Sequence, residues 1–301
     1  MLSTSIANIE LGNPLILASG ILDTTGNMMR KIAGYAGAIT TKSVSLNPRD
    51  GHKNPTVIET NDYMLNAIGL SNPGIDEFID EIKIVKKTKK PVIGSIIGCN
   101  EEEFAKLARK IGNYVDAVEI NVSCPNIINE KIGQEIGKDP ELVAKIVKKV
   151  KDSVHIPIIV KLTPNVDDIV IIAKAAESAG ADAITAINSL GPGMAINIEA
   201  RKPVLSNKFG GMSGPAIKPV AIADVYKIYE AVKIPIIGTG GIVHGKDAIE
   251  MLMAGASAVG VGSAVYYRGY DVFKKITNEM LAWMKKNKIK SIKELIGVAH
   301  N

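Results

Sequence analysis

The sequence is poor in cysteine and in long hydrophobic runs, and each shortage excludes a class of protein. Its two cysteines, Cys99 and Cys124, are too few for a disulfide framework, a cysteine-rich zinc site or an iron–sulfur cluster on this chain. The longest apolar runs, such as PLILAS, span about six residues, whereas a helix that crosses a bilayer needs roughly 20. The first residues contain neither a basic segment nor a continuous apolar segment. We therefore expect no secretory signal, no membrane span and a cytoplasmic location.

Aromatic residues make up only 4% of the chain and do not interleave with its basic residues. The net charge of +5 comes from 36 basic and 31 acidic residues, and the lysines are spread along helix-like segments such as 86–90 and 284–290. Solvated helix faces explain this pattern better than nucleic-acid binding, which uses aromatic residues for base stacking. The histidines show no metal-ligand spacing. We expect no nucleic-acid partner and no bound metal.

The remaining sequence, 46% hydrophobic and 22% charged, has the composition of a folded protein and alternates between two periodicities. Short apolar runs bounded by Gly, Pro, Asn or Ser predict strands at 14–18, 38–42, 91–97, 117–122, 157–162, 183–188, 235–239 and 258–262. Amphipathic stretches between them predict helices, for example at 101–111, 140–152, 167–179, 219–232 and 271–286. This order predicts a single α/β domain over residues 1–301, a (β/α)8 TIM barrel.

Two segments, 43–73 and 189–216, are too long to be plain loops, and a shorter insertion runs through 123–138. Each follows a predicted strand and precedes a predicted helix. They should therefore lie at the C-terminal face of the barrel, where the active sites of this architecture are found.

The predicted strands end in polar residues or glycine-rich turns, which a barrel would bring together. The residues are Ser19, Lys42, Ser95, Asn121, Lys161 and Asn188, followed by GTGG at 238–241 and GVGS at 260–263. Backbone N–H groups in turns of the last kind bind phosphate, although the glycines could simply permit tight turns. Their place after the last two strands favours a phosphorylated ligand.

Lys42 and Lys161 are not expected on the surface if they end barrel strands. Such a lysine forms a Schiff base with a carbonyl substrate or supplies a fixed positive charge to an anionic ring or carboxylate. Asparagines near the strand ends, namely Asn66, Asn121, Asn126 and Asn188, suit a flat heterocycle with imide edges better than a sugar phosphate. Each could instead be a turn residue.

Cys124 lies just beyond the fourth predicted strand, in the sequence NVSCPN. Its loop position and polar neighbours favour a base or nucleophile over a buried structural thiol. We interpret Cys99 as structural.

Several motifs together resemble the dihydroorotate dehydrogenases of class 1, and within them the catalytic subunits of class 1B. They are ASG (18–20), TTKS (40–43), NAIGLSNPG (66–74), NVSCPN (121–126), KLTPN (161–165), INS (187–189), GGMSGPAIKP (210–219), GTGGI (238–242) and GVGSA (260–264). The resemblance covers nearly the whole chain. It implies FMN-dependent oxidation of dihydroorotate to orotate in pyrimidine biosynthesis.

The resemblance also implies roles for individual residues. Cys124 takes the place of the catalytic base, and Lys42 serves catalysis as well as binding. FMN contacts carry over to Ser19, Lys42, Ser43, Asn121, Lys161, Ile187, Gly214, Gly240, Gly241, Gly262 and Ser263. Substrate contacts carry over to Lys42, Asn66, Ala67, Ile68, Gly69, Leu70, Asn121, Asn126, Asn188 and Ser189. Ser95 and Ser189 depart from the Asn and Thr usual in the family, which puts a flavin contact at Ser95 in doubt.

Class 1B enzymes pair this subunit with a second one that carries FAD and an iron–sulfur cluster and passes electrons to NAD. The resemblance therefore implies a heterotetramer of two catalytic and two electron-transfer subunits. A dihydropyrimidine dehydrogenase acting on uracil or thymine is the nearest alternative. A Schiff-base aldolase or phosphosugar isomerase using Lys161 is more distant, and a barrel that only binds leaves the polar strand ends unexplained.

Overall fold

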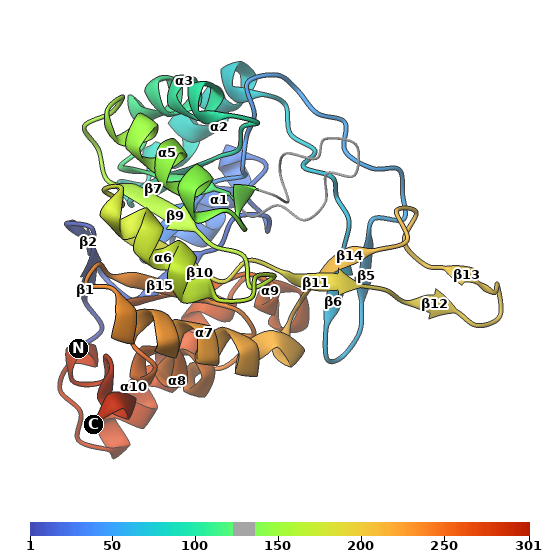
Figure 1. Cartoon of the computed structure of the whole chain (residues 1–301). Coiled ribbons are helices and arrows are strands. Elements are labelled where there is room, and N and C mark those ends of the chain that lie inside the picture. Colours follow the sequence, from blue (N-terminus) through green and yellow to red (C-terminus); the bar gives the residue numbers. More distant parts are fainter. Residues whose placement is uncertain (123–135) are drawn as a thin grey trace.

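The predicted strands form a closed parallel barrel in the computed structural model, which describes residues 1–122 and 136–301 (Figure 1). They follow one another around the barrel in chain order, and the last pairs with the first: β3 (Leu15–Leu17), β4 (Ala38–Thr40), β7 (Val92–Ile96), β8 (Ala117–Asn121), β9 (Ile158–Lys161), β10 (Ala183–Ala186), β15 (Ile236–Thr239) and β16 (Ala258–Val261). Each lies within its predicted range. The predicted (β/α)8 fold is confirmed.

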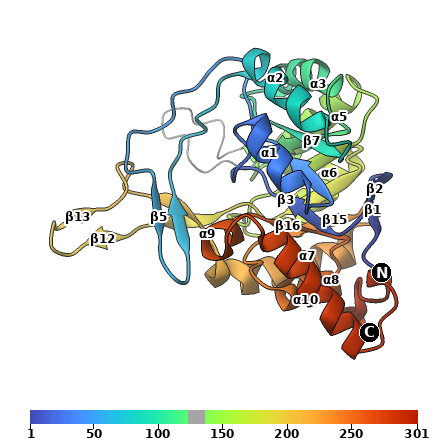
Figure 2. The ribbon, with the colours of Figure 1, turned by 180° about the vertical axis from the view of Figure 1, so that it is seen from behind.

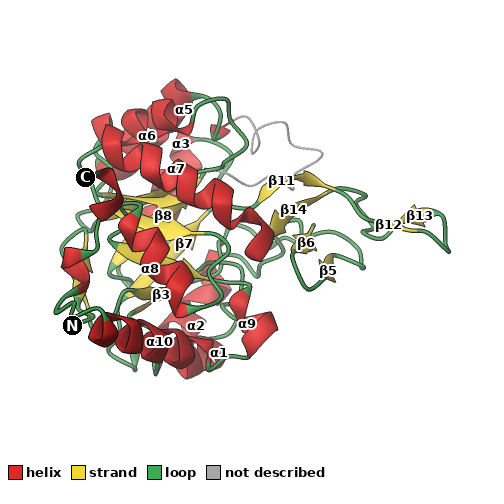
Figure 3. Cartoon of the chain, turned by 90° about the horizontal axis from the view of Figure 1, so that it is seen from below, coloured by secondary structure: helices red, strands yellow, loops and turns green. Residues whose placement is uncertain are grey.

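Helices follow the barrel strands and surround them (Figure 3). They are α1 (Gly26–Ala33), α2 (Ile75–Lys86), α3 (Glu101–Gly112), α5 (Pro140–Lys151), α6 (Ile169–Ser178), α7 (Lys218–Ala231), α8 (Gly245–Met253), α9 (Ala264–Arg268) and α10 (Val272–Lys286), with short 3-10 turns η1 (Pro215–Ile217), η2 (Ile292–Glu294) and η3 (Val298–His300). Local signals set their ends. The Asp139 side chain, for example, accepts hydrogen bonds from the N–H groups of Glu141 and Leu142, and Pro140 occupies the first helical position.

A hairpin of β1 (Thr4–Ile6) and β2 (Ile9–Leu11), which the sequence did not predict, packs against the N-terminal end of the barrel interior. Ile6 and Leu11 join a layer to which each barrel strand contributes one residue. Around the barrel this layer alternates large and small side chains: Ile16, Ala38, Ile93, Ala117, Ile159, Ala183, Ile237 and Ala258. The alternation lets isoleucines fill the interior without crowding.

Shortening one isoleucine of this layer is expected to destabilise the barrel. Ile159→Val should lower the free energy of unfolding by about 1 kcal/mol, because Ile159 is fully buried and the layer cannot close around the lost methyl group. Urea unfolding measures the change. Ile171→Val, on the exposed face of α6, is the matched control, and an equal loss in both variants would contradict this account.

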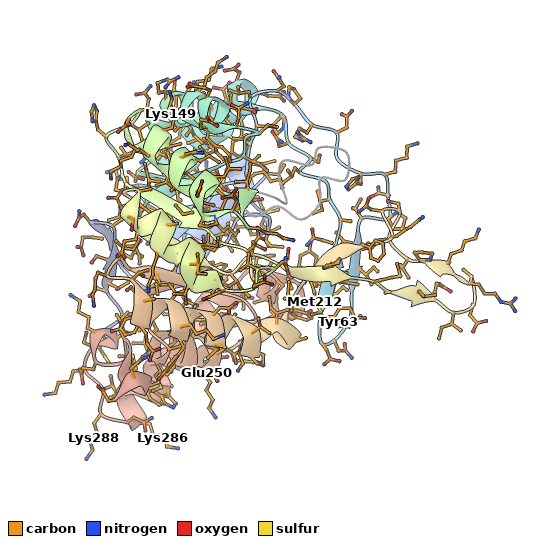
Figure 4. The ribbon with its side chains drawn as sticks, viewed as in Figure 1. Tyr63, Lys149, Met212, Glu250, Lys286 and Lys288 are labelled. Atoms are coloured by element: carbon orange, nitrogen blue, oxygen red, sulfur yellow. The ribbon has the colours of Figure 1, made fainter. Side chains whose placement is uncertain are left out.

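The insertions at 43–73 and 189–216 lie at the C-terminal end of the barrel, as predicted, and pair with each other. They form an antiparallel sheet in the order β11 (Leu190–Gly193), β14 (Gly210–Ser213), β6 (Met64–Asn66) and β5 (Val57–Glu59). A hairpin of β12 (Ile196–Asn197) and β13 (Lys202–Pro203) extends beyond this sheet, as both side views show (Figures 1 and 2). Met212 packs against both the sheet's own small core and the barrel core, and Figure 4 shows it beside Tyr63 where the sheet meets the barrel. The insertion sheet therefore forms a wall at the barrel mouth.

Candidate functional site

A cavity at the C-terminal end of the barrel is lined by residues that follow the strands and by the insertion sheet. It gathers most of the predicted site residues, from segments far apart in the sequence. Those that line it are Ser19, Lys42, Ser43, Asn66, Ile68, Gly69, Leu70, Asn121, Lys161, Ile187, Asn188, Ser189, Gly214, Gly240, Gly241, Gly262 and Ser263. One cavity thus brings together most of the predicted cofactor and substrate residues.

One predicted residue lies elsewhere, and two fall outside the described residues. Ala67 is fully buried in the small core of the insertion sheet and does not line the cavity. Cys124 and Asn126 lie outside the described residues, so their predicted roles stay predictions.

Sequence reasoning missed further residues that line the cavity: Ala18, Gly20, Ile21, Val57, Met64, Ser213, Ile217, Ile242 and Tyr266. Thr239 and Gly260, in the glycine-rich turns expected to meet there, line it as well. Some of the missed residues, such as Ser213, lie inside the motifs quoted above and could have been found there. Val57 and Met64 carry no such signal, because they reach the cavity only after two distant insertions pair into one sheet.

Lys42 and Lys161 bring two ammonium groups to the cavity. Lys161 is only 5% exposed, and within the described part of the chain no acceptor lies in hydrogen-bonding distance of either Nζ. The nearest carboxylate to Lys161 is Glu119, whose Oε1 lies 4.0 Å from Nζ. Because a buried cation without a hydrogen-bonding partner is unfavourable, the cavity is suited to an anionic ligand.

Asp23 is a second buried carboxyl behind the cavity wall, and Gly20 donates a backbone hydrogen bond to it. Burial raises the pKa of Asp23 above its usual range, although the charge of Lys42 and the Gly20 hydrogen bond oppose this effect. Lys42 thus favours the ionised form of Asp23 against the effect of burial.

Hydroxyl and amide groups form a network that runs from the cavity lining to Ser95 beneath it. Ser43 Oγ lies 3.2 Å from Ser19 Oγ and 2.8 Å from Ser95 Oγ, and it accepts a 3.1 Å hydrogen bond from Asn121 Nδ2. Ser95 does not line the cavity and is fully buried. Its hydroxyl joins the network below the site, and Ser95 is not among the residues placed to contact a ligand in the cavity.

The turn after β15 requires glycine. Gly240 and Gly241 adopt φ angles of +134° and +73°, and a Cβ at Gly241 would lie 2.4 Å from Lys218 Cβ. Among the described residues, the N–H groups of Gly240, Gly241, Gly262 and Ser263 donate no hydrogen bond, and the buried Thr239 Oγ1 has no partner. Unpaired donors at one edge of a cavity are the arrangement that binds phosphate.

Asp247 holds the segment that follows this turn. Its carboxylate accepts hydrogen bonds from the N–H groups of Val243 and His244 and from Lys218 Nζ at 2.8–3.0 Å. Burial by itself would raise the pKa of Asp247, but these hydrogen bonds outweigh it and hold the pKa below its usual range. The ionised carboxylate therefore stabilises the fold.

Asp247→Asn is expected to lower the free energy of unfolding by about 1–2 kcal/mol at neutral pH, as loss of a helix cap does. Because the folded-state pKa lies below the unfolded value of 3.8, this stabilisation is complete above that value and disappears as the pH falls through the folded pKa. Urea unfolding at neutral pH and near pH 3 measures both. Glu250→Gln, which alters a more exposed partner of Lys218, is the control. An Asp247→Asn loss that does not shrink in acid would contradict the assignment.

The described residues contain no group of three or more His, Cys, Asp or Glu side chains that could hold a metal ion. In the same residues, every helix is too short or too polar to cross a membrane.

Comparison with known proteins gives consistent matches over the whole chain. A family model described as dihydroorotate dehydrogenase matches residues 1–284. The catalytic subunit of dihydroorotate dehydrogenase B (NAD(+)) from Methanocaldococcus jannaschii is 51% identical, over 100% of this chain and 98% of its own length. The subunit of the same name from Methanothermobacter thermautotrophicus is also 51% identical, over 100% of this chain and 99% of its own. The subunit of the same name from Thermoplasma acidophilum is 48% identical, over 99% of this chain and 98% of its own length.

Proposed function

Because the chain belongs to the dihydroorotate dehydrogenase family, we propose that it catalyses the FMN-dependent oxidation of dihydroorotate to orotate in pyrimidine biosynthesis. The observation that carries this proposal is the convergence, in one cavity, of two lysines and a row of backbone N–H groups that find no hydrogen-bond acceptor in residues 1–122 and 136–301. A phosphorylated cofactor with an anionic reduced ring and a substrate with a carboxylate both need such groups.

The residues present fit FMN. The unpaired N–H groups of Gly240, Gly241, Gly262 and Ser263 would hold its phosphate, and any larger side chain at Gly241 would meet Lys218. Lys161 would stabilise the negative charge on the reduced ring, with Asn121 and Ser19 as further polar contacts. When bound, FMN supplies the acceptor for the hydride that leaves C6 of dihydroorotate.

The substrate would bind between the barrel mouth and the insertion sheet. Lys42 would pair with its carboxylate, and the amides of Asn66, Asn121 and Asn188 would orient the ring. Ser189 and the 68–70 backbone also line this part of the cavity. These residues would thus hold the substrate in the same cavity as the cofactor, as hydride transfer requires.

Cys124 would act as the general base and take the proton from C5 of dihydroorotate onto Sγ. In the sequence it follows Asn121, the last residue of β8, by three positions, and the resemblance to the family supports this role. Cys124→Ser is expected to slow reduction of bound FMN by dihydroorotate at least about tenfold while FMN stays bound, because a serine hydroxyl is a far weaker base than a thiolate. Anaerobic stopped-flow absorbance measures the rate. Cys99→Ser is the control, and unchanged reduction in Cys124→Ser would remove Cys124 from this role.

Electrons would leave through a partner subunit that carries FAD and an iron–sulfur cluster and reduces NAD, in a heterotetramer of two catalytic and two electron-transfer subunits. The printed name of the relatives, a catalytic subunit of an NAD(+)-dependent enzyme, supports this arrangement. Tagged protein purified from its native host should bring down an iron-containing flavoprotein. Recovery of the chain alone would count against the partner.

Orotate formation by the purified chain tests the proposed activity. After reconstitution with FMN, the chain should convert dihydroorotate to orotate with an artificial dye as electron acceptor. It should not do so with NAD alone, because the partner is missing. No orotate with any acceptor, in protein that holds FMN, would overturn the proposal.

A further inference from the structure

Glu119 is a buried carboxylate inside the barrel, directly beneath the cavity, and the proposed reaction does not use it. It is 2% exposed and lies two residues before Asn121 on β8, so both side chains point to the barrel interior. Ser95 is its register partner on β7, and Thr185, on β10, is the register partner of Lys161. Glu119 and Ser95 therefore lie one layer deeper in the barrel than Asn121 and Lys161, which pair in register and line the cavity.

Two hydroxyl groups hold the Glu119 carboxylate in place. Ser95 Oγ donates to Oε1 at 3.2 Å, and Thr185 Oγ1 donates to Oε2 at 2.9 Å. The Glu119–Lys161 pair is correspondingly open, with 4.0 Å between Oε1 and Nζ. At the surface, by contrast, Lys86 and Lys110 contact their aspartates at 2.8 Å and 2.6 Å. The hydroxyls thus keep the carboxylate from closing onto the ammonium.

The carboxylate also fixes the direction of the hydrogen bonds above it. An ionised carboxylate only accepts, so the single hydroxyl proton of Ser95 points to Glu119. Ser43 must then donate to Ser95, and Ser19 must donate to Ser43. The chain of serines therefore runs from the cavity lining to Glu119 in one direction.

We propose that Glu119 is a positioning residue that partly neutralises Lys161 from behind and so sets how strongly the cavity stabilises the reduced, anionic form of FMN. The inference rests on the proposed function, since it assumes that FMN binds against Lys161. At about 4 Å in the low-dielectric interior, a carboxylate acts strongly on an ammonium. Ser95 and Thr185 determine the distance between the Glu119 carboxylate and the Lys161 ammonium. They thereby determine how much of the positive charge of Lys161 acts on the cofactor.

Removing the charge and releasing the carboxylate should shift the midpoint potential of bound FMN in opposite directions. Glu119→Gln keeps the shape but leaves Lys161 uncompensated, so the ratio of reduced to oxidised FMN at a given potential should rise at least tenfold, about 30 mV. Ser95→Ala and Thr185→Val let the carboxylate approach Lys161, so the potential should fall by a smaller amount. Spectroelectrochemical titration of each FMN-loaded variant measures these shifts.

Asp116→Asn is the matched control. It removes a carboxylate that pairs with Lys86 just before β8, away from the cavity, and should leave the potential unchanged. Thermal unfolding of the FMN-free proteins distinguishes this role from a purely structural one. If Glu119, Ser95 and Thr185 only stabilise the fold, their variants should have lower melting temperatures but no opposite shifts in potential. Should Glu119→Gln fail to fold, a fall in potential in both hydroxyl variants would still support the proposal.

The possible failures can be told apart. If the wild-type protein binds FMN but Glu119→Gln leaves the potential unchanged, the role of Glu119 is overturned and the proposed function stands. A shift in the same direction in every variant would have the same meaning. Unchanged potentials in both hydroxyl variants would overturn that role equally. Wild-type protein that takes up no FMN would overturn the proposed function and this inference together.

Discussion

Replacing Lys161 with methionine is expected to slow reduction of bound FMN by dihydroorotate about 100-fold, as loss of one preorganised electrostatic group in an active site does. Lys161 is 5% exposed and, among the described residues, has no hydrogen-bond acceptor, so its charge is available to the cofactor. Methionine fills a similar volume without the charge. Anaerobic stopped-flow absorbance measures the rate, and the potential of bound FMN should fall in the same variant.

Lys174→Met is the control for this prediction, because Lys174 lies exposed on α6. It should leave the rate unchanged. A Lys161→Met protein that retains FMN and is reduced at the wild-type rate would show that the ammonium does not stabilise the developing charge.

Replacing Gly241 with alanine is expected to weaken FMN binding by about 100-fold or more. A Cβ at this position would lie 2.4 Å from Lys218 Cβ and 2.8 Å from Lys218 N, while the φ angle of +73° disfavours any residue with a side chain. A strained residue of this kind costs about 1–3 kcal/mol, and relief of the strain would turn the N–H groups away from the phosphate. Fluorescence titration of FMN-free protein measures the affinity.

Gly112→Ala is the matched control, because a Cβ at the end of α3 would meet Ile156 at 3.5 Å, an ordinary contact. It should retain wild-type affinity for FMN. Equal affinities in Gly241→Ala and wild type would place the phosphate elsewhere in the cavity.

The barrel was predictable because its strands are buried on both faces, whereas its helices are buried on one face only. The two kinds of element therefore have different hydrophobic periods in the sequence. Strands such as β9 read as apolar runs, and helices such as α5 carry a capping residue and a clear 3.6-residue period. The β1–β2 hairpin and the insertion sheet were not predicted. Their strands are three or four residues long, and those of the insertion sheet pair with partners distant in the sequence, so local periodicity does not reveal them.

The site residues at the ends of the barrel strands were predictable from the sequence. The residues one layer deeper in the barrel were less so. Lys42, Asn121 and Lys161 were found because a barrel brings the residues at its strand ends together. Glu119 was missed although it is the single charge in the apolar strand AVEIN, a signal that sequence analysis could have used. What it does there depends on its distances to Ser95 and Lys161, which only the folded chain defines.

An anaerobic absorption spectrum of the FMN-loaded protein, titrated separately with dihydroorotate and dihydrouracil, tests the central claim most directly. Our account predicts that dihydroorotate bleaches the oxidised-flavin band at one equivalent per FMN, because Lys42 supplies a partner for its carboxylate, and that dihydrouracil does not. Bleaching by dihydrouracil alone would indicate a dihydropyrimidine dehydrogenase. A protein that cannot be loaded with FMN would contradict the flavin chemistry itself.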